Sequence, residues 1–194
     1  MVKFQLSTFN FQLSKLLVGA TFVFSGFVKA IDPLGTTYKI QDYLEVMQLS
    51  WLSELALVTS FALITAEFLA GILLITNINF KLGLWLSSLL MVAMTPLTLW
   101  IALTNPVTDC GCFGDAIILS NWATFWKNIV LDALIIILWI LQKRLYRSWL
   151  TPFPSWVLTI TFSLITIGMG IHSLNNLPII DFRPYKIGND ILEG

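Results

Sequence analysis

The stretch LGLWLSSLLMVAMTPLTLWIAL, residues 82–103, contains no charged residue and is long enough to cross a lipid bilayer. A transmembrane helix needs about 20 consecutive, mainly apolar residues. Four more apolar segments flank this one, and together they predict transmembrane helices at 12–31, 54–76, 82–104, 122–142 and 154–174. The sequence therefore predicts an all-α, polytopic membrane protein, in which a four-helix bundle is followed by a fifth transmembrane helix.

The composition of the whole chain indicates the same environment. Hydrophobic residues make up 57% of the 194 residues, charged residues make up 11%, and the mean hydropathy is +0.82. Soluble domains carry about 25% charged residues, so this chain has too few to cover a surface in water. The net charge is zero and no basic run occurs. We therefore expect the lipid bilayer as a partner and no binding to nucleic acid.

Basic residues in one short connection predict the orientation. Lys143, Arg144 and Arg147 lie close together between the fourth and fifth segments, and short basic loops remain in the cytoplasm. This orientation predicts a cytoplasmic N-terminus and a C-terminus on the outer side of the membrane. A signal peptide is the alternative for the first segment, but FSGFVKAIDP, residues 24–33, contains no convincing small-residue cleavage site. We therefore expect a retained helix.

Three parts follow from this topology. Residues 1–142 form the four-helix membrane domain, residues 143–174 form the cytoplasmic basic loop with the fifth transmembrane helix, and residues 175–194 form a tail on the outer side. Within the first part we expect a helix on the outer membrane surface at about 38–50 and a cysteine-containing outer loop at 105–121. Small residues that predict close approach of neighbouring helices are Gly19, Gly26, Ala70, Gly71, Gly168 and Gly170.

The two cysteines of the chain, Cys110 and Cys112, lie in DCGCFGD, residues 109–115. On the predicted topology they face a compartment in which disulfides form and persist. A structural disulfide stabilises mainly by closing a long loop, so a bridge across one residue would stabilise the fold very little. Gly111 allows the two thiols to meet, and we expect the resulting small ring to be strained and oxidising. The spacing therefore favours a redox pair.

Two other interpretations of the cysteines stay open. One is a merely structural or vestigial pair. The other is a soft-metal site, in which two thiolates bind Cu(I) and residues near the outer end of the fifth helix, His172 and Met169, complete the ligand set. No Cys/His cluster with zinc spacing occurs. The neighbouring acid Asp115 would raise a thiol pKa, so the start of the fourth transmembrane helix is the candidate source of positive potential for thiol activation.

Two carboxylic acids lie within predicted transmembrane helices, Glu67 in the second and Asp132 in the fourth. Intramembrane carboxylates are costly and are candidate functional residues. For Glu67 the functional interpretation is proton delivery to a reducible group such as a quinone, and the structural one is a protonated carboxyl group hydrogen-bonded between helices. Asn128 precedes Asp132 by one turn on the same face, which predicts a shared polar patch between helices.

Several stretches carry a resemblance to a known family. GATFVFSGFVKAIDPLG (residues 19–35), AEFLAG (66–71) and DCGCFGD (109–115) resemble the DoxX-like superfamily of small membrane proteins, and within it the branch that contains the methylamine-utilisation protein MauE. The tail LPIIDFRPYKIG (177–188) is similar to that of a bacterial subgroup whose chains continue into an outer domain. The resemblance implies a four-helix membrane domain linked to thiol or quinone redox work, with Cys110 and Cys112 as the redox pair and Glu67 as the family's helix-two acid.

Taken together, these features predict a membrane-embedded thiol–disulfide oxidoreductase. Its partner is expected to be a periplasmic thiol protein or domain, and its cofactor a quinone. We expect Phe113 and Trp122 to wall the cofactor site, and His172 is a further candidate there. The alternatives are a non-enzymatic scaffold or assembly factor for a periplasmic partner or domain, and a copper-binding protein.

Overall fold

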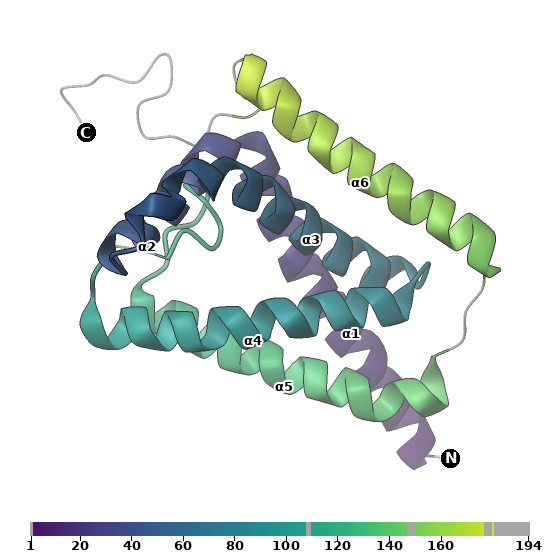
Figure 1. The fold of residues 1–194 in the computed structure, drawn as a ribbon. Coiled ribbons are helices and arrows are strands. Elements are labelled where there is room, and N and C mark those ends of the chain that lie inside the picture. Colours follow the sequence, from purple (N-terminus) through teal and green to yellow (C-terminus); the bar gives the residue numbers. More distant parts are fainter. Residues whose placement is uncertain (1, 108–109, 147–149, 177–179, 181–194) are drawn as a thin grey trace.

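The computed structural model describes residues 2–107, 110–146, 150–176 and 180, and these are helical apart from short connections. Figure 1 shows the arrangement of the helices. In chain order they are α1 (Val2–Ile31), α2 (Pro33–Val46), the 3-10 helix η1 (Ser50–Leu55), α3 (Ala56–Thr76), α4 (Phe80–Thr104), α5 (Asn121–Leu145) and α6 (Pro152–Asn175). The predicted outer tail, 175–194, lies almost wholly outside the described residues.

Five segments of the described chain are long and apolar enough to span a membrane. They are Ser7–Ile31, Ser50–Thr76, Phe80–Thr104, Asn121–Lys143 and Pro152–Asn175. Each overlaps one of the predicted segments, with most bounds within four residues of the expected ones. The prediction of an all-α protein with five transmembrane helices is therefore confirmed. The reason is that a helix satisfies its own backbone hydrogen bonds inside lipid, and hydropathy over about 20 residues reports whether its side chains are stable there.

The closest helix contact in the fold lies between α1 and α3. A Cβ atom added to Gly71 would lie 2.5 Å from the carbonyl oxygen of Gly19 and 2.5 Å from the backbone nitrogen of Val23. The predicted close approach of these two helices is confirmed, since the backbones touch where neither residue has a side chain. The same prediction is wrong for Gly168, where an added Cβ would meet nothing within 4 Å.

The helix expected at about 38–50 is present but begins earlier. Asp32 caps its N-terminus by accepting a hydrogen bond from the backbone N–H of Gly35 (2.9 Å), and Pro33 occupies the first helical turn. The helix ends at Val46, and Gln48 follows with a positive φ of 59°. The capping residue, rather than the apolar periodicity, set the start of α2. Its middle part also lines a cavity instead of lying only on the membrane surface.

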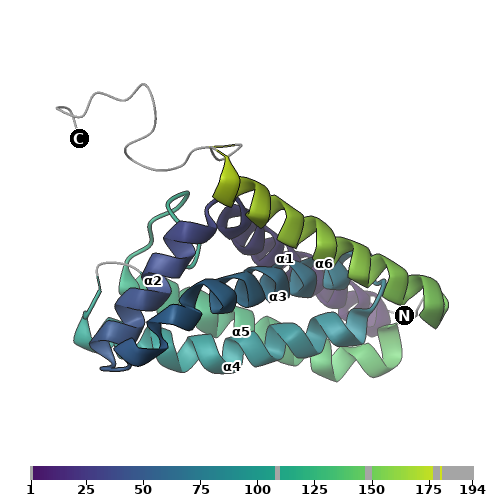
Figure 2. The ribbon, with the colours of Figure 1, turned by 45° about the horizontal axis from the view of Figure 1, so that its top comes forward.

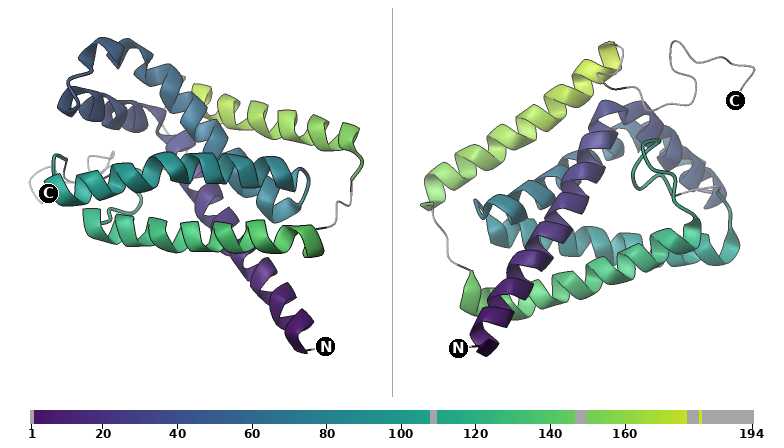
Figure 3. Two further views of the ribbon diagram at one scale, coloured as in Figure 1. Left: turned by 60° about the horizontal axis from the view of Figure 1, so that its bottom comes forward. Right: turned by 180° about the vertical axis from the view of Figure 1, so that it is seen from behind.

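The remaining helices build two packing regions around α1 and α3. The largest core cluster joins α1, α3, α4 and α5 and includes Phe11, Val18, Leu74, Phe80 and Leu138, each at most 1% exposed. Helix α6 packs against α3, α1 and α2 at the side of this bundle (Figure 2). The views in Figure 3 show that the α4–α5 loop and α2 lie near one end of the bundle, whereas the N-terminus and the α3–α4 turn lie toward the other.

Candidate functional site

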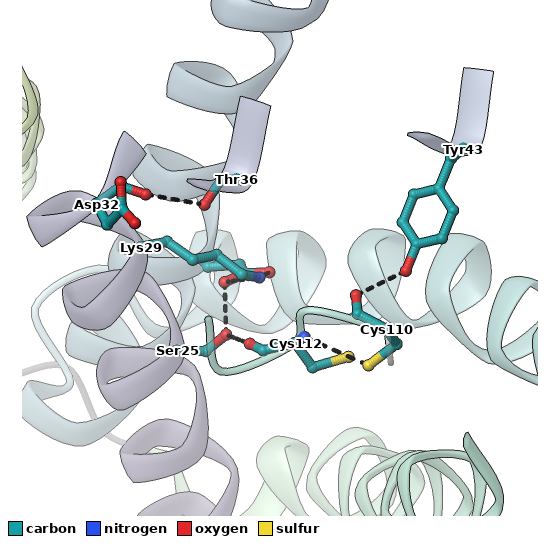
Figure 4. Close-up of polar contacts among 8 residues, drawn as sticks. Ser25, Lys29, Asp32, Thr36, Tyr43, Cys110 and Cys112 are labelled. Atoms are coloured by element: carbon teal, nitrogen blue, oxygen red, sulfur yellow. Dashed lines mark hydrogen bonds and ion pairs between the residues drawn. The ribbon is translucent and has the colours of Figure 1, made fainter. Parts of the chain in front are cut away.

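The cysteine loop folds back against α1 and α2 through two hydrogen bonds to its own carbonyl groups. The Tyr43 hydroxyl of α2 donates to the carbonyl oxygen of Cys110 (2.7 Å), and Ser25 Oγ of α1 lies 2.6 Å from the carbonyl oxygen of Cys112. Gly111 has a φ of +63°, which a residue with a side chain rarely adopts. The positive φ of Gly111 therefore allows the loop to turn back onto α1 and α2. Figure 4 shows the two hydrogen bonds, from Tyr43 and from Ser25, that hold it there.

The two thiols are free and form hydrogen bonds with each other. Cys110 Sγ accepts a hydrogen bond from the backbone N–H of Cys112 (3.3 Å) and lies 3.6 Å from Thr124 Oγ1 at the start of α5. The hydrogen bond from the Cys112 thiol is the main cause that lowers the pKa of Cys110 to about 6, and Thr124 and the positive charge of Lys127 add to it. The same hydrogen bond, together with burial, raises the pKa of Cys112 well above its usual value.

The thiols therefore differ in charge at neutral pH. Cys110 is mainly a thiolate, and Cys112 stays a thiol that donates to it. A thiolate stabilised in the reduced state favours the dithiol over the disulfide, which makes the disulfide form a stronger oxidant. The start of the fourth transmembrane helix does contribute to thiol activation as expected, although it does so through the side chains of Thr124 and Lys127.

Behind the loop lies an ion pair buried between α1 and α3. Lys29 Nζ donates to both carboxylate oxygens of Glu67, at 2.7 Å and 2.9 Å, and the two side chains are 5% and 6% exposed. Ser25 Oγ lies 2.7 Å from Glu67 Oε2. Glu67 thus joins two helices through an ion pair, and not through the protonated carboxyl group of the structural interpretation. It also lies one hydroxyl group away from the cysteine loop.

Lys29 and Ser25 were not identified as site residues from the sequence. Their signal was present, because they are four residues apart and so share one face of a helix. An acid within an apolar segment requires a partner, and Lys29 is the one basic residue in the C-terminal half of α1. Hydropathy treats such a lysine only as an interruption, whereas it is the counter-charge of Glu67.

The cysteines and the ion pair open onto one cavity of about 240 Å³. Its lining includes the polar groups of Lys29, Glu67, Cys110, Cys112 and Lys127. Apolar side chains of α4 and α5 also line it, namely Met91, Met94, Leu97, Ile101 and Leu131. Thr36, Lys39, Ile40 and Tyr43 of α2 also line it. The site is therefore a small amphipathic chamber at one end of the bundle.

Of the three residues expected at a cofactor site, Phe113 lines the cavity, whereas Trp122 and His172 do not. Phe113 lines the cavity, where Lys127 Nζ lies 4.5 Å from its ring centroid and Phe24 packs edge-on at 5.5 Å. Trp122 is 47% exposed and packs against Phe125 instead. His172 is exposed near the end of α6, where its ring nitrogen lies 3.3 Å from Asn176 Nδ2. The structure brings only Phe113 to the cysteine pair.

The polar patch expected at Asn128 and Asp132 does join two helices. Asn128 Nδ2 donates to Thr98 Oγ1 (3.0 Å), and the Thr95 hydroxyl donates to Asp132 Oδ2 (2.7 Å). Both threonines belong to α4, so α5 is attached to α4 by two side-chain hydrogen bonds one turn apart. Asn128 reaches the cavity, whereas Asp132 is not among the cavity residues. Among the described residues, no group of three His, Cys, Asp or Glu side chains is placed to hold a metal ion.

The sequence profile of one family, described as methylamine utilisation protein MauE, matches residues 7–141, which is more than half of the chain. The chain belongs to the MauE family. The matched range covers α3, α4 and almost all of α1 and α5, together with every residue that lines the cavity. Helix α6 lies outside it. A search of curated proteins and a search of solved structures each found no match. The candidate site is therefore contained within the MauE part of the chain, and α6 is an addition to it.

Proposed function

We propose that this MauE-family protein is a membrane-embedded thiol–disulfide redox module of the bacterial inner membrane. Its Cys110–Cys112 pair oxidises a dithiol in a periplasmic protein or domain and passes the electrons on to a quinone. The observation that carries the proposal is the pair itself, in which a thiolate with a pKa of about 6 is hydrogen-bonded to a second thiol and both line one cavity. Low-pKa thiols beside a second cysteine are characteristic of disulfide exchange.

The exchange with the partner is written so that atoms and electrons balance. A partner thiolate attacks the Cys110–Cys112 disulfide, the sulfur–sulfur bond breaks, and a mixed disulfide forms. The second partner thiolate then displaces the module, so the partner dithiol loses two electrons and two protons as its own disulfide forms. The pair gains the two electrons and one proton, which Cys112 binds, and the other proton goes to solution because Cys110 stays a thiolate.

The residues around the cavity fit a quinone head group. Quinones are flat rings with polar oxygens and an apolar tail, and the cavity is lined by both polar and apolar side chains within one membrane bundle. Lys127, Asn128 and Thr98 would hold the polar oxygens, and Met91, Met94 and Phe113 would contact the ring. When bound, a quinone supplies a two-electron, two-proton acceptor. Glu67 is the candidate proton donor, since its carboxyl group lines the same cavity.

The test uses the fact that the chain has only two cysteines. Membranes are quenched with acid, and free thiols are then labelled with a maleimide that adds mass. We expect the wild-type pair to shift between bridged and free when quinone reduction is blocked or restored. In Cys112→Ser we expect Cys110 to trap a mixed disulfide with the partner. A pair that stays reduced and unreactive under every growth condition contradicts the proposal.

The double variant Cys110→Ser/Cys112→Ser separates this function from a scaffold. A redox module loses all activity in partner maturation when both sulfurs are replaced. A scaffold retains partner binding and function, because serine keeps the size and the hydrogen bonding of the loop. Asp132→Asn is the matched control, since it alters an intramembrane carboxylic acid that does not line the cavity.

A further inference from the structure

Helix α2 covers one side of the cysteine turn through two side chains that lie one helical turn apart. The Tyr43 hydroxyl donates to the carbonyl oxygen of Cys110 at 2.7 Å. A Cβ atom added to Gly111 would lie 3.0 Å from Cγ of Lys39, so the methylene groups of this lysine pack on the glycine. Residues four apart share one face of a helix. The two side chains therefore hold the peptide between Cys110 and Gly111 from the same side.

The orientation of this peptide decides what the sulfur of Cys110 meets. With Gly111 at a φ of +63°, the chain turns so that the backbone N–H of Cys112 donates to Cys110 Sγ at 3.3 Å. Asn and Asp side chains close turns in the same way, by accepting from the N–H two residues on. On its other side the sulfur lies 3.6 Å from Oγ1 of the fully buried Thr124 in α5. The direction of the N–H thus depends on the carbonyl group that Tyr43 holds.

The hydrogen bond from the N–H to the sulfur favours the reduced pair. A thiolate is a charged acceptor and binds a donor strongly, whereas a disulfide sulfur carries no charge and binds the same donor weakly. A contact that stabilises the thiolate therefore makes the disulfide a stronger oxidant. A glycine between the two cysteines gives the turn many other conformations. A contact from outside the loop is needed to keep this one.

We propose that Tyr43 is a positioning residue for the redox pair: its hydroxyl fixes the carbonyl group of Cys110 so that the N–H of Cys112 stays on the Cys110 sulfur, and this makes the pair a stronger oxidant of thiols (Figure 4). This rests on the redox function proposed above. Tyr43 acts through the backbone of the turn and takes no part in the transfer of electrons.

The test is the exchange equilibrium at pH 7 between the full-length protein in lipid nanodiscs and glutathione buffers. Oxidised glutathione takes two electrons from the pair and becomes two glutathione molecules; one proton comes from Cys112 and the other from solution. In Tyr43→Phe only the hydroxyl is lost, and we expect the disulfide to form about three- to fivefold more readily, because one ordinary hydrogen bond no longer supports the thiolate. Maleimide labelling after an acid quench measures the fraction of free thiols.

Tyr38→Phe is the matched control, because it removes the same hydroxyl group from the same helix. Tyr38 is 59% exposed and does not line the cavity, so this variant should have the equilibrium constant of the wild type. A Tyr43→Phe equilibrium that is unchanged, or that shifts toward the dithiol, overturns the positioning role while the redox function stands. A wild-type pair that never exchanges with glutathione overturns both.

A second measurement follows Cys110 in the dithiol state alone. At pH 6, close to the pKa of about 6 of Cys110, a smaller thiolate fraction slows alkylation by iodoacetamide. We expect Tyr43→Phe to slow this reaction about three- to fivefold. Gly111→Ala should also slow it, because a side chain strains the φ of +63° and meets Lys39. Since both changes break one turn, the double variant should be no slower than the slower single variant. Effects that multiply would place the action of the hydroxyl outside the turn and overturn the proposal.

Discussion

At the scale of single residues, the site is a series of buried polar groups, each of which has a neighbour as its hydrogen-bond or ion-pair partner. Lys29 neutralises Glu67, Glu67 meets Ser25, and Ser25 meets the carbonyl group of Cys112. Breaking such a pair by removing one partner costs about 3–5 kcal/mol, because it leaves an uncompensated buried charge. The two thiols continue the chain, and their mutual hydrogen bond makes two identical side chains chemically different.

That hydrogen bond yields a prediction for Cys112→Ala. The pKa of Cys110 should rise from about 6 toward the ordinary thiol value of about 8.5, because the donor that stabilises the thiolate is removed. Since the thiolate is present above the pKa and lost below it, alkylation of Cys110 by iodoacetamide at pH 7 should slow about tenfold. Cys112→Ser retains a donor and should slow it less. Equal rates in all three proteins would contradict the assignment.

At the scale of helices, the site depends on how closely α1 and α3 approach. Ser25 and Lys29 belong to α1 and Glu67 to α3, so the ion pair is a contact between two helices. Gly71 lies one turn beyond Glu67 on α3 and touches the backbone of α1. Without a side chain at this position, the separation of the helices allows an ion pair at 2.7 Å.

We therefore predict that Gly71→Ala destabilises the protein by about 1–3 kcal/mol, because the added methyl group must push two backbones apart. Thermal denaturation in detergent, followed by the loss of helical signal, measures the change. Gly168→Ala is the matched control in α6, where the added methyl group meets open space and alanine favours a helix. If both variants melt at the same temperature as the wild type, the contact between α1 and α3 is not tight.

At the scale of the whole molecule, the helices place the polar site at one end of an otherwise apolar bundle. The cap Asp32, the helix α2 and the cysteine loop all lie at this end (Figure 1). Helix α2 lines the same cavity as the two thiols, through Tyr43 and Ile40. An outer-face redox site requires this end to face the periplasm.

The topology prediction is tested on a Cys110→Ser/Cys112→Ser background with single cysteines introduced at exposed positions. A membrane-impermeant maleimide applied to intact spheroplasts should label Gln48→Cys, which follows the end of α2, and should spare Lys81→Cys at the start of α4. Both should react after permeabilisation. Labelling of Lys81→Cys alone would reverse the orientation and place the thiol pair in the reducing cytoplasm, where a disulfide donor does not persist.

The amino-acid sequence by itself determined the transmembrane helices and the site's main chemical groups. Hydropathy summed over about 20 residues reports whether a segment is stable in lipid, so the five helices were predictable without knowing how they pack. The cysteines and Glu67 were predictable because thiols in a loop and an acid in an apolar segment are rare. The bounds of α2 were predicted less well, because a single capping residue decides where such a helix begins.

The tertiary structure alone decided which of these groups meet. Lys29 and Glu67 are 38 residues apart and Ser25 and Cys112 are 87 apart, so no local pattern reports their contact. Packing of α1 against α3 joins the first pair, and the cysteine loop folding onto α1 joins the second. Neither His172 nor Trp122 lines the cavity. Hydropathy measures transfer of a segment into lipid and is blind to the partner a polar group finds there, which is the physical reason why the helices were predictable and the buried network was not.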